Sequence, residues 1–218
     1  TVGIFDLPSH SFSAVDIGTE PNIGSKNRYV GAAAAHDGLV VFAPAMAPAI
    51  GLFNATSQTF STVPISSTES KRKYCGATAA HNGLTSVIVF APMREDAVGL
   101  FDPHTLSYSR VDISATIASD DKYWGAATAA NGLVVFAPYT APNVGVLDPV
   151  SGSFSVVDIE SIAPPLLQHG RFRGAAASRL GPVVFPPHDG RVVGVFDPES
   201  LVFSVVDVGS DYMFGYMY

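Results

Sequence analysis

The chain has little charge and almost no cysteine. Only 14% of its 218 residues are charged, and the single cysteine, Cys75, excludes an intrachain disulfide. The net charge of −7 argues against a protein that binds nucleic acid through bulk positive charge. No apolar run approaches the ~18 residues that a membrane helix needs. We therefore expect neither a nucleic-acid partner nor insertion into a membrane.

Helical periodicity is also missing from the sequence. Hydrophobic residues make up 47% of the chain, which is enough for a core, and glycine (20 residues) and proline (16 residues) are plentiful. Short apolar runs of five to eight residues, separated by turn residues, are typical of strands. These features predict an all-β protein.

One motif recurs along the whole chain: Val or Ile, glycine, two hydrophobic residues, and Asp or Asn. Its copies are 46 to 49 residues apart, a spacing that indicates a structural repeat. The motif glycines are Gly3, Gly51, Gly99, Gly145 and Gly194.

Each copy has the same internal order, shown here by residues 122–159. An apolar run over 122–130 is followed by Asn131-Gly132, a strong hairpin signal, and by a second run over 133–138. A loop leads to a third run over 144–148, and a turn leads to an alternating run over 153–159. Four short antiparallel strands per repeat predict a β-propeller blade.

The runs Leu-Val-Val-Phe, Val-Gly-Val-Leu-Asp-Pro-x-Ser and Phe-Ser-Val-Val resemble the kelch and YVTN groups of propeller repeats. Residues 131–149 are similar to repeats of uncharacterised algal and bacterial proteins, which read roughly Asn-Gly-Lys-Ile-Tyr-x-Ile-Pro and then Val-Ile-Asp-Pro. The resemblance covers the whole chain and implies a propeller, but it implies little about function. Ala-Pro, as at Ala137-Pro138, stands where kelch repeats have paired glycines.

We expect residues 1–218 to form one propeller domain of five blades. The N-terminal third and fourth strands and the C-terminal segment Tyr212–Tyr218 would share one blade, which removes open sheet edges. That blade lacks a second strand, so it is incomplete or residues upstream of Thr1 are missing. The predicted repeats are a partial one over 1–27, full ones over 28–72, 73–121, 122–170 and 171–211, and a partial one over 212–218.

The first strand of each repeat should line the axis, where small side chains fit. A basic residue precedes the aromatic residue that opens each of these strands, and four such cations at one mouth of the axis could hold an anion. The alternative is that each cation pairs with an acid of its own loop, where Glu20, Glu69, Asp120 and Asp121 lie. The four pairs are Arg28-Tyr29, Lys73-Tyr74, Lys122-Tyr123 and Arg171-Phe172.

The loops between second and third strands should share that face and vary most. Tyr139 and His188 lie in them and complete the candidate ligand-binding set with Arg28, Lys73, Lys122 and Arg171. The repeated Asp at the end of the third strand predicts an Asx turn rather than a metal ligand. Scattered histidines and a cysteine in an inner strand indicate no catalytic residue, metal site or cofactor.

The residues leave three functions open. The first is a non-catalytic binding module for a protein, a glycan or a small anionic ligand. The second is a structural subunit of a larger assembly. The third is a propeller hydrolase or lyase, which would depend on loop residues such as Glu95, Asp96, His188 and Asp189.

Overall fold

The computed structural model describes residues 1–17, 27–67, 72–162, 170–179, 181–188 and 190–209, and these form strands and turns without a helix. The strands pair into five antiparallel sheets, four with four strands and one with two. Within the described part of the chain, no helix is long and apolar enough to cross a membrane.

The N-terminal hairpin pairs β1 (Val2–Asp6) with β2 (Ser11–Val15). Blade 1 consists of β3 (Tyr29–Ala34), β4 (Leu39–Pro44), β5 (Ala49–Asn54) and β6 (Thr59–Pro64). Blade 2 consists of β7 (Tyr74–His81), β8 (Ser86–Pro92), β9 (Ala97–Asp102) and β10 (Ser107–Asp112). Blade 3 consists of β11 (Tyr123–Thr128), β12 (Val134–Pro138), β13 (Asn143–Asp148) and β14 (Ser153–Asp158). Blade 4 consists of β15 (Ala176–Ala177), β16 (Val183–Phe185), β17 (Val192–Asp197) and β18 (Val202–Asp207).

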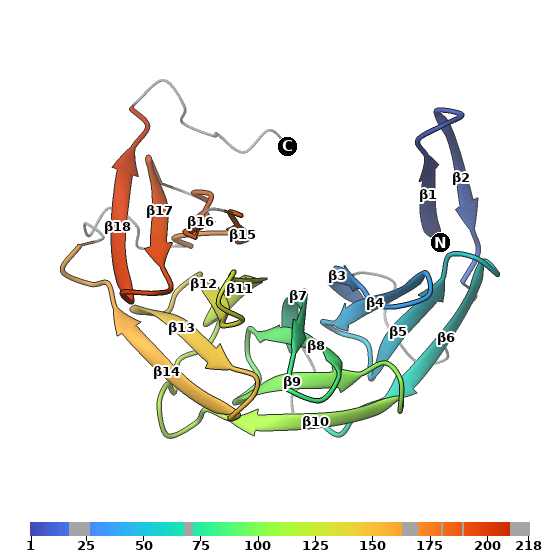
Figure 1. Ribbon diagram of the computed structural model, residues 1–218, viewed down its shortest axis with the longest axis horizontal. Helices are drawn as coiled ribbons and strands as arrows, with labels where there is room; N and C mark the ends of the chain where they lie inside the picture. The colour runs from blue at the N-terminus through green and yellow to red at the C-terminus, as the bar shows by residue number, and fades with distance from the viewer. Residues whose placement is uncertain (18–26, 68–71, 163–169, 180, 189, 210–218) are drawn as a thin grey trace.

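The sheets follow one another around a common axis, with the hairpin and blade 4 at the two ends of the arc (Figure 1). The first strand of each complete blade lies nearest the axis and the fourth lies outermost. The predicted all-β propeller of four-stranded antiparallel blades is confirmed, and the hairpin stands as a fifth, two-stranded blade. The strand predicted from Tyr212–Tyr218 lies outside the described residues.

The inner strands approach one another at a glycine. A Cβ on Gly31, Gly76 or Gly125 would lie 2.6 Å from the Cα of the equivalent glycine in the next blade, which for Gly125 is Gly174. All four glycines have positive φ. We expected small residues beside the axis, and the structure confirms this. The backbones of neighbouring inner strands leave no room for a side chain at Gly31, Gly76 or Gly125.

Each of these glycines lies at a β-bulge in blades 1 to 3. In blade 3, Tyr123 pairs with Pro138 and Ala126 pairs with Phe136, so β11 contains one more residue than β12 over this stretch. The same irregularity occurs in β3 and β7. A bulge changes the direction of the side chains that it contains, and in blade 3 it contains Trp124.

The core is divided among the interfaces between successive blades. At each complete interface, one blade contributes aromatic and branched residues, and the blade before it contributes a Val and an Ala from its second strand together with branched residues from its third. Between blades 1 and 2 these are Val41, Ala43, Ile50 and Leu52 against Tyr74, Ile88, Phe90 and Phe101.

Candidate functional site

The residue before each inner strand joins two loops through its backbone. The carbonyl of Lys122 accepts hydrogen bonds from the N–H groups of Tyr139 (2.9 Å) and Ala141 (3.3 Å) in the β12–β13 loop. Its own N–H donates to the carbonyl of Met93 (2.8 Å) in the loop of the preceding blade. Lys73 and Arg171 repeat this arrangement with their own loops. The basic positions are thus points at which neighbouring blades are attached to each other.

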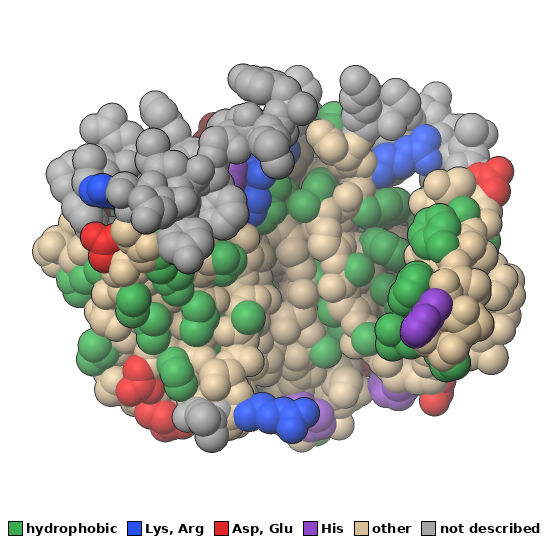
Figure 2. All heavy atoms as spheres, turned by 90° about the horizontal axis from the view of Figure 1, so that it is seen from above, with side chains coloured by type: hydrophobic (Ala, Val, Ile, Leu, Met, Phe, Trp, Pro, Cys, Tyr) green, Lys and Arg blue, Asp and Glu red, His purple; other side chains and the backbone are tan. Residues whose placement is uncertain are grey.

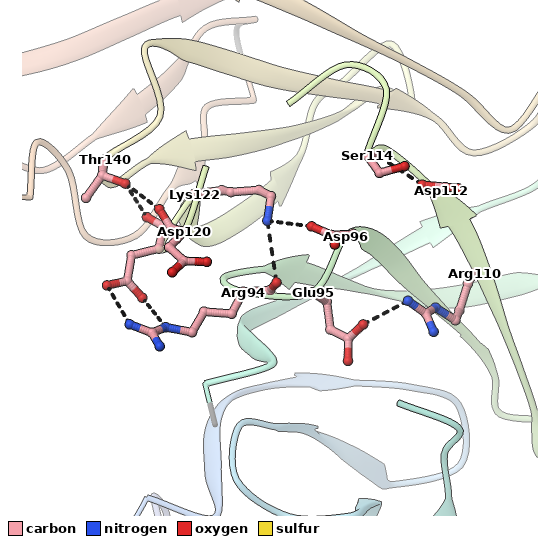
Figure 3. A network of polar contacts seen from close by, with 10 residues as sticks. Arg94, Glu95, Asp96, Arg110, Asp112, Ser114, Asp120, Lys122 and Thr140 are labelled. Carbon is pink, nitrogen blue, oxygen red and sulfur yellow. Dashed lines mark hydrogen bonds and ion pairs between the residues drawn. The ribbon is translucent and has the colours of Figure 1, made fainter. Parts of the chain in front are cut away.

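Two of the four basic side chains are buried. Lys73 is 3% exposed and Lys122 is 1% exposed, although both lie on the loop face. The Lys122 ammonium lies 3.2 Å from a carboxylate oxygen of Asp96, which belongs to blade 2 (Figure 3). Lys122 therefore has an acidic partner, but this acid belongs to the neighbouring blade, whereas the alternative placed it in the residue's own loop.

A second ion pair crosses the same interface in the opposite direction. The Arg94 guanidinium in the β8–β9 loop donates to the Asp121 carboxylate, with a shortest distance of 2.9 Å (Figure 3). Blade 2 thus contributes the cation Arg94 and the anion Asp96. The residues that lead into blade 3 contribute their partners, Asp121 and Lys122. The two ion pairs connect the β8–β9 loop of blade 2 to the segment that leads into blade 3.

Arg171 and Arg28 occupy the remaining basic positions and are both half-buried. The Arg171 guanidinium donates to the carbonyls of Thr140 and Ala141 in blade 3, and burial lowers its pKa. The carbonyl of Arg28 accepts the N–H groups of residues 45–47. Binding of a ligand by these four positions stays a prediction.

Next to this framework lies an aromatic and basic cluster made of Trp124, Tyr139, Arg173 and His188. The Arg173 guanidinium lies 3.9 Å above the centre of the Trp124 ring and 5.9 Å from that of Tyr139. The Tyr139 ring is 5.1 Å from Trp124 and 5.5 Å from His188, centroid to centroid. Cation–π contact and ring packing therefore join an inner strand of blade 3 to the residues that begin blade 4.

Backbone contacts at Gly174 and Gly170 fix the position of the cluster. The N–H of Gly174 donates to the carbonyl of Trp124 at 2.7 Å, which attaches the two inner strands to each other. A Cβ on Gly170 would lie 2.6 Å from the Tyr139 ring and 2.7 Å from His188, so the chain passes directly against both rings. Arg173 is exposed, whereas Trp124, Tyr139 and His188 are half-buried. The arrangement presents one accessible cation on a rigid aromatic base.

The inner wall of the arc is otherwise hydrophobic or uncharged. Figure 2 looks onto this wall and shows Lys and Arg side chains near its upper and lower edges, with hydrophobic side chains and backbone between them. Among the described residues, no carboxylate forms an ion pair with Arg173. An anion that approaches the cluster would meet a guanidinium that forms no ion pair with a carboxylate of the described residues.

The acids considered for catalysis are engaged elsewhere. Glu95 is 2% exposed and pairs with Arg110 at 2.8 Å (Figure 3). It also accepts a hydrogen bond from Ser67. Asp96 pairs with Lys122 as described above, and Asp189 lies outside the described residues. No group of three or more metal-ligating side chains occurs in the described ranges.

The repeated Asp or Asn closes the turn after each third strand. Asp148 accepts the N–H of Val150 (2.9 Å) and the hydroxyl of Ser151 (2.7 Å), and these bonds lower its pKa. Asn54 accepts the equivalent N–H of Thr56 at 2.9 Å. The predicted Asx turns are therefore present.

Cys75 is 1% exposed in β7, and burial raises the pKa of its thiol to about 12. A thiol in such surroundings stays protonated at neutral pH and is a poor nucleophile.

Sequence reasoning found Tyr139 and His188 but missed Trp124 and Arg173 as a pair. Both occupy the position after the aromatic residue of the inner strand, where blades 1 and 2 have Val30 and Cys75. This position varies between otherwise similar repeats, and that variation was the available signal. The contact itself joins residues 49 positions apart and comes from the packing of two blades.

No protein family model matches the chain, and no curated protein matches it. Among solved structures it is similar to a streptogramin B lyase, with 14% identity, a TM-score of 0.75, and coverage of 95% of this chain and 62% of the lyase. It is also similar to an inactive variant of virginiamycin B lyase from Staphylococcus aureus, crystallised with quinupristin, at 12% identity, a TM-score of 0.66, and coverage of 86% and 59%. A third similar structure is the extracellular domain of BT4673 from B. thetaiotaomicron, at 10% identity, a TM-score of 0.68, and coverage of 97% and 28%.

The chain spans less than two thirds of the length of each of these structures. At these identities the similarity shows a shared propeller fold. The neighbours include both lyases and an extracellular domain, so they support a propeller without deciding between binding and catalysis.

Proposed function

We propose that this protein is a non-catalytic binding module that takes an anionic, carboxylate-bearing ligand at the cluster of Trp124, Tyr139, Arg173 and His188. The carrying observation is the exposed Arg173 guanidinium stacked 3.9 Å above Trp124. Stacking fixes the plane of the guanidinium and leaves its N–H edge available. A planar carboxylate can accept two parallel hydrogen bonds from that edge.

Of the four predicted basic positions, Arg171 supports this proposal through its charge, whereas Asp96 compensates the charge of Lys122. Arg171 lies two residues before Arg173 and is half-buried. Its charge adds positive potential on the loop face of an otherwise acidic protein, and such a local potential favours the approach of an anion.

The test is a binding screen with matched acidic and neutral ligands, such as oligogalacturonides and their methyl esters. We expect the acids to bind and the esters to bind at least about tenfold more weakly, since a lost charge-assisted hydrogen bond is worth about 1.5–3 kcal/mol. Arg173→Lys keeps the charge but loses the planar fork and should also weaken binding. Arg191→Lys, at an exposed position in blade 4, is the matched control.

Two results would refute the proposal. One is a set of acidic ligands that bind the Arg173→Lys variant as tightly as the original protein. The other is the absence of any difference between acids and esters across the screen.

A lyase is the second candidate, and His188 is the observation that favours it. Its imidazole lies beside Tyr139 at the candidate site, and one similar structure is described as a catalytically inactive histidine-to-alanine variant of a lyase. Turnover of a bound ligand that His188→Ala abolishes, while binding persists, would establish this function instead.

A further inference from the structure

The turn after the third strand of blade 1 differs from its equivalents in the other repeats. In every other repeat this strand ends in Asp, and proline or leucine follows it. Blade 1 has Asn54, Ala55 and Thr56 at these three positions. The hydroxyl residue that all five turns share comes one position later, at Ser57 in blade 1. This turn alone therefore contains Asn-Ala-Thr, which is an acceptor triplet for N-linked glycosylation.

The missing proline is part of that chemistry. Asp102, Asp148 and Asp197 are each followed by proline, which would exclude an acceptor triplet even if Asn replaced the Asp. Ala55 removes this block, and the other two changes supply the carboxamide and the hydroxyl at the required spacing. Three departures from the repeat thus act together on one modification signal.

The fold leaves the amide nitrogen of Asn54 available. Its Oδ1 accepts the N–H groups of Thr56 (2.9 Å) and Ser57 (3.0 Å). In the equivalent turn of blade 3, the second side-chain oxygen of Asp148 accepts the Ser151 hydroxyl at 2.7 Å. In Asn54 the corresponding atom is Nδ2, which forms no hydrogen bond with a described residue and is not buried. The oxygen therefore holds the turn while the nitrogen faces solvent.

The surroundings of this turn have room for a large substituent. Residues 55–58 are all exposed, so a glycan on Asn54 would displace no packed side chain. Asn54 is the last residue of β5, whereas the β4–β5 loop leads into the first residue, Ala49. A glycan would therefore project from the end of the blade opposite to the loop face and would leave the aromatic and basic cluster open.

We propose that Asn54 is an N-glycosylation site. In the reaction, Nδ2 attacks C1 of the first sugar of a lipid-linked oligosaccharide diphosphate. A bond forms between Nδ2 and C1, and the bond between C1 and the diphosphate oxygen breaks. The amide loses one proton, and the lipid diphosphate leaves with the electron pair. Such triplets are modified in secreted proteins, so the proposal also places this chain on a secretory route. It does not depend on the ligand proposed above.

The first test is mass spectrometry of the protein from its native source. The proteolytic peptide that contains Asn54 should carry a glycan. An amidase that removes N-linked glycans should convert Asn54 to Asp, with uptake of heavy oxygen from labelled water. An unmodified Asn54 in this material would overturn the proposal.

The second test is secreted expression of variants in a eukaryotic cell. Asn54→Asp should abolish the glycan without loss of folding, because a carboxylate closes the same turn at Asp148. Thr56→Ala should also abolish it, and Thr56→Ser should retain it. A glycan that persists in the Thr56→Ala variant would overturn the proposal.

Asn82 is the matched control within the same chain. Its Oδ1 also accepts the N–H groups of the residues two and three positions later, Leu84 (3.1 Å) and Thr85 (2.9 Å). Because leucine stands where the acceptor triplet needs a hydroxyl, Asn82 should stay unmodified. Equal modification of Asn82 and Asn54 would contradict the role assigned to the triplet.

Discussion

At the scale of single residues, the glycines of the inner strands set how closely the blades approach the axis. A side chain at Gly125 would overlap the backbone of Gly174 in the next blade, and φ is +100° at Gly125. Both the contact and the conformation require glycine. The turn residue Gly132 has a similar φ of +88°, but nothing lies within 4 Å of its missing Cβ. A substitution at Gly132 would therefore cause backbone strain alone, whereas a substitution at Gly125 would cause backbone strain and steric overlap.

We expect Gly132→Ala to lower the free energy of unfolding by about 1 kcal/mol, which is the cost of a positive φ. Gly125→Ala should cost at least about 2 kcal/mol more, because the neighbouring backbone would have to move. Urea denaturation followed by circular dichroism measures both. Equal losses in the two variants would show that the contact between inner strands contributes nothing.

At the scale of elements, each turn between third and fourth strands is closed by a side chain that accepts backbone N–H groups. In Asp148 the hydroxyl of Ser151 and the N–H of Val150 lower the pKa, so the ionised carboxylate stabilises the folded state. That contribution is present above the pKa of the unfolded chain and is lost as the pH falls through the lower folded pKa. Asp102 and Asp197 have lowered pKa values for related reasons, but Asn54 does not titrate.

We expect Asp148→Asn to preserve the turn, as Asn54 does in blade 1, and to make unfolding less dependent on pH below about pH 4. Asp148→Ala should destabilise the protein at every pH, because the N–H of Val150 loses its acceptor. Thermal melts between pH 2.5 and 7 measure both effects. A pH dependence of Asp148→Asn identical to that of the original protein would contradict the role assigned to the carboxylate.

At the scale of the whole molecule, the same repeat position can be core or surface. Phe12 of the N-terminal hairpin is 71% exposed, whereas Phe203, its equivalent in blade 4, is 3% exposed. Phe5 is 57% exposed, and its equivalent Phe196 is 0% exposed. The hairpin therefore has the residues of a blade interface without a described blade against its outer face.

We expect Phe203→Ser to lower the free energy of unfolding by about 3–5 kcal/mol, since it removes a packed ring from a blade interface. Phe12→Ser should change it by less than about 0.5 kcal/mol and should reduce binding of a dye specific for exposed apolar surface. Denaturation and dye fluorescence measure the two effects. A large loss of stability from Phe12→Ser would show that something covers this face in solution.

The sequence by itself determined the strands, their order and the blade architecture. Each of these depends on local chemistry that recurs along the chain: alternating apolar runs, an Asn-Gly or Asp-Gly turn in three of the four full repeats, and an Asp or Asn that closes the next turn. It also indicated which loops share a face, since strand order and chain direction decide that.

Only the tertiary structure decided which side chains meet. The burial of Lys122 beside Asp96 and the stacking of Arg173 on Trp124 both arise between blades. Such contacts depend on the bulge that redirects a side chain and on the distance at which neighbouring blades pack. A local sequence pattern specifies neither the bulge nor the distance between blades, because both depend on the packing of residues that lie about one repeat apart in the sequence.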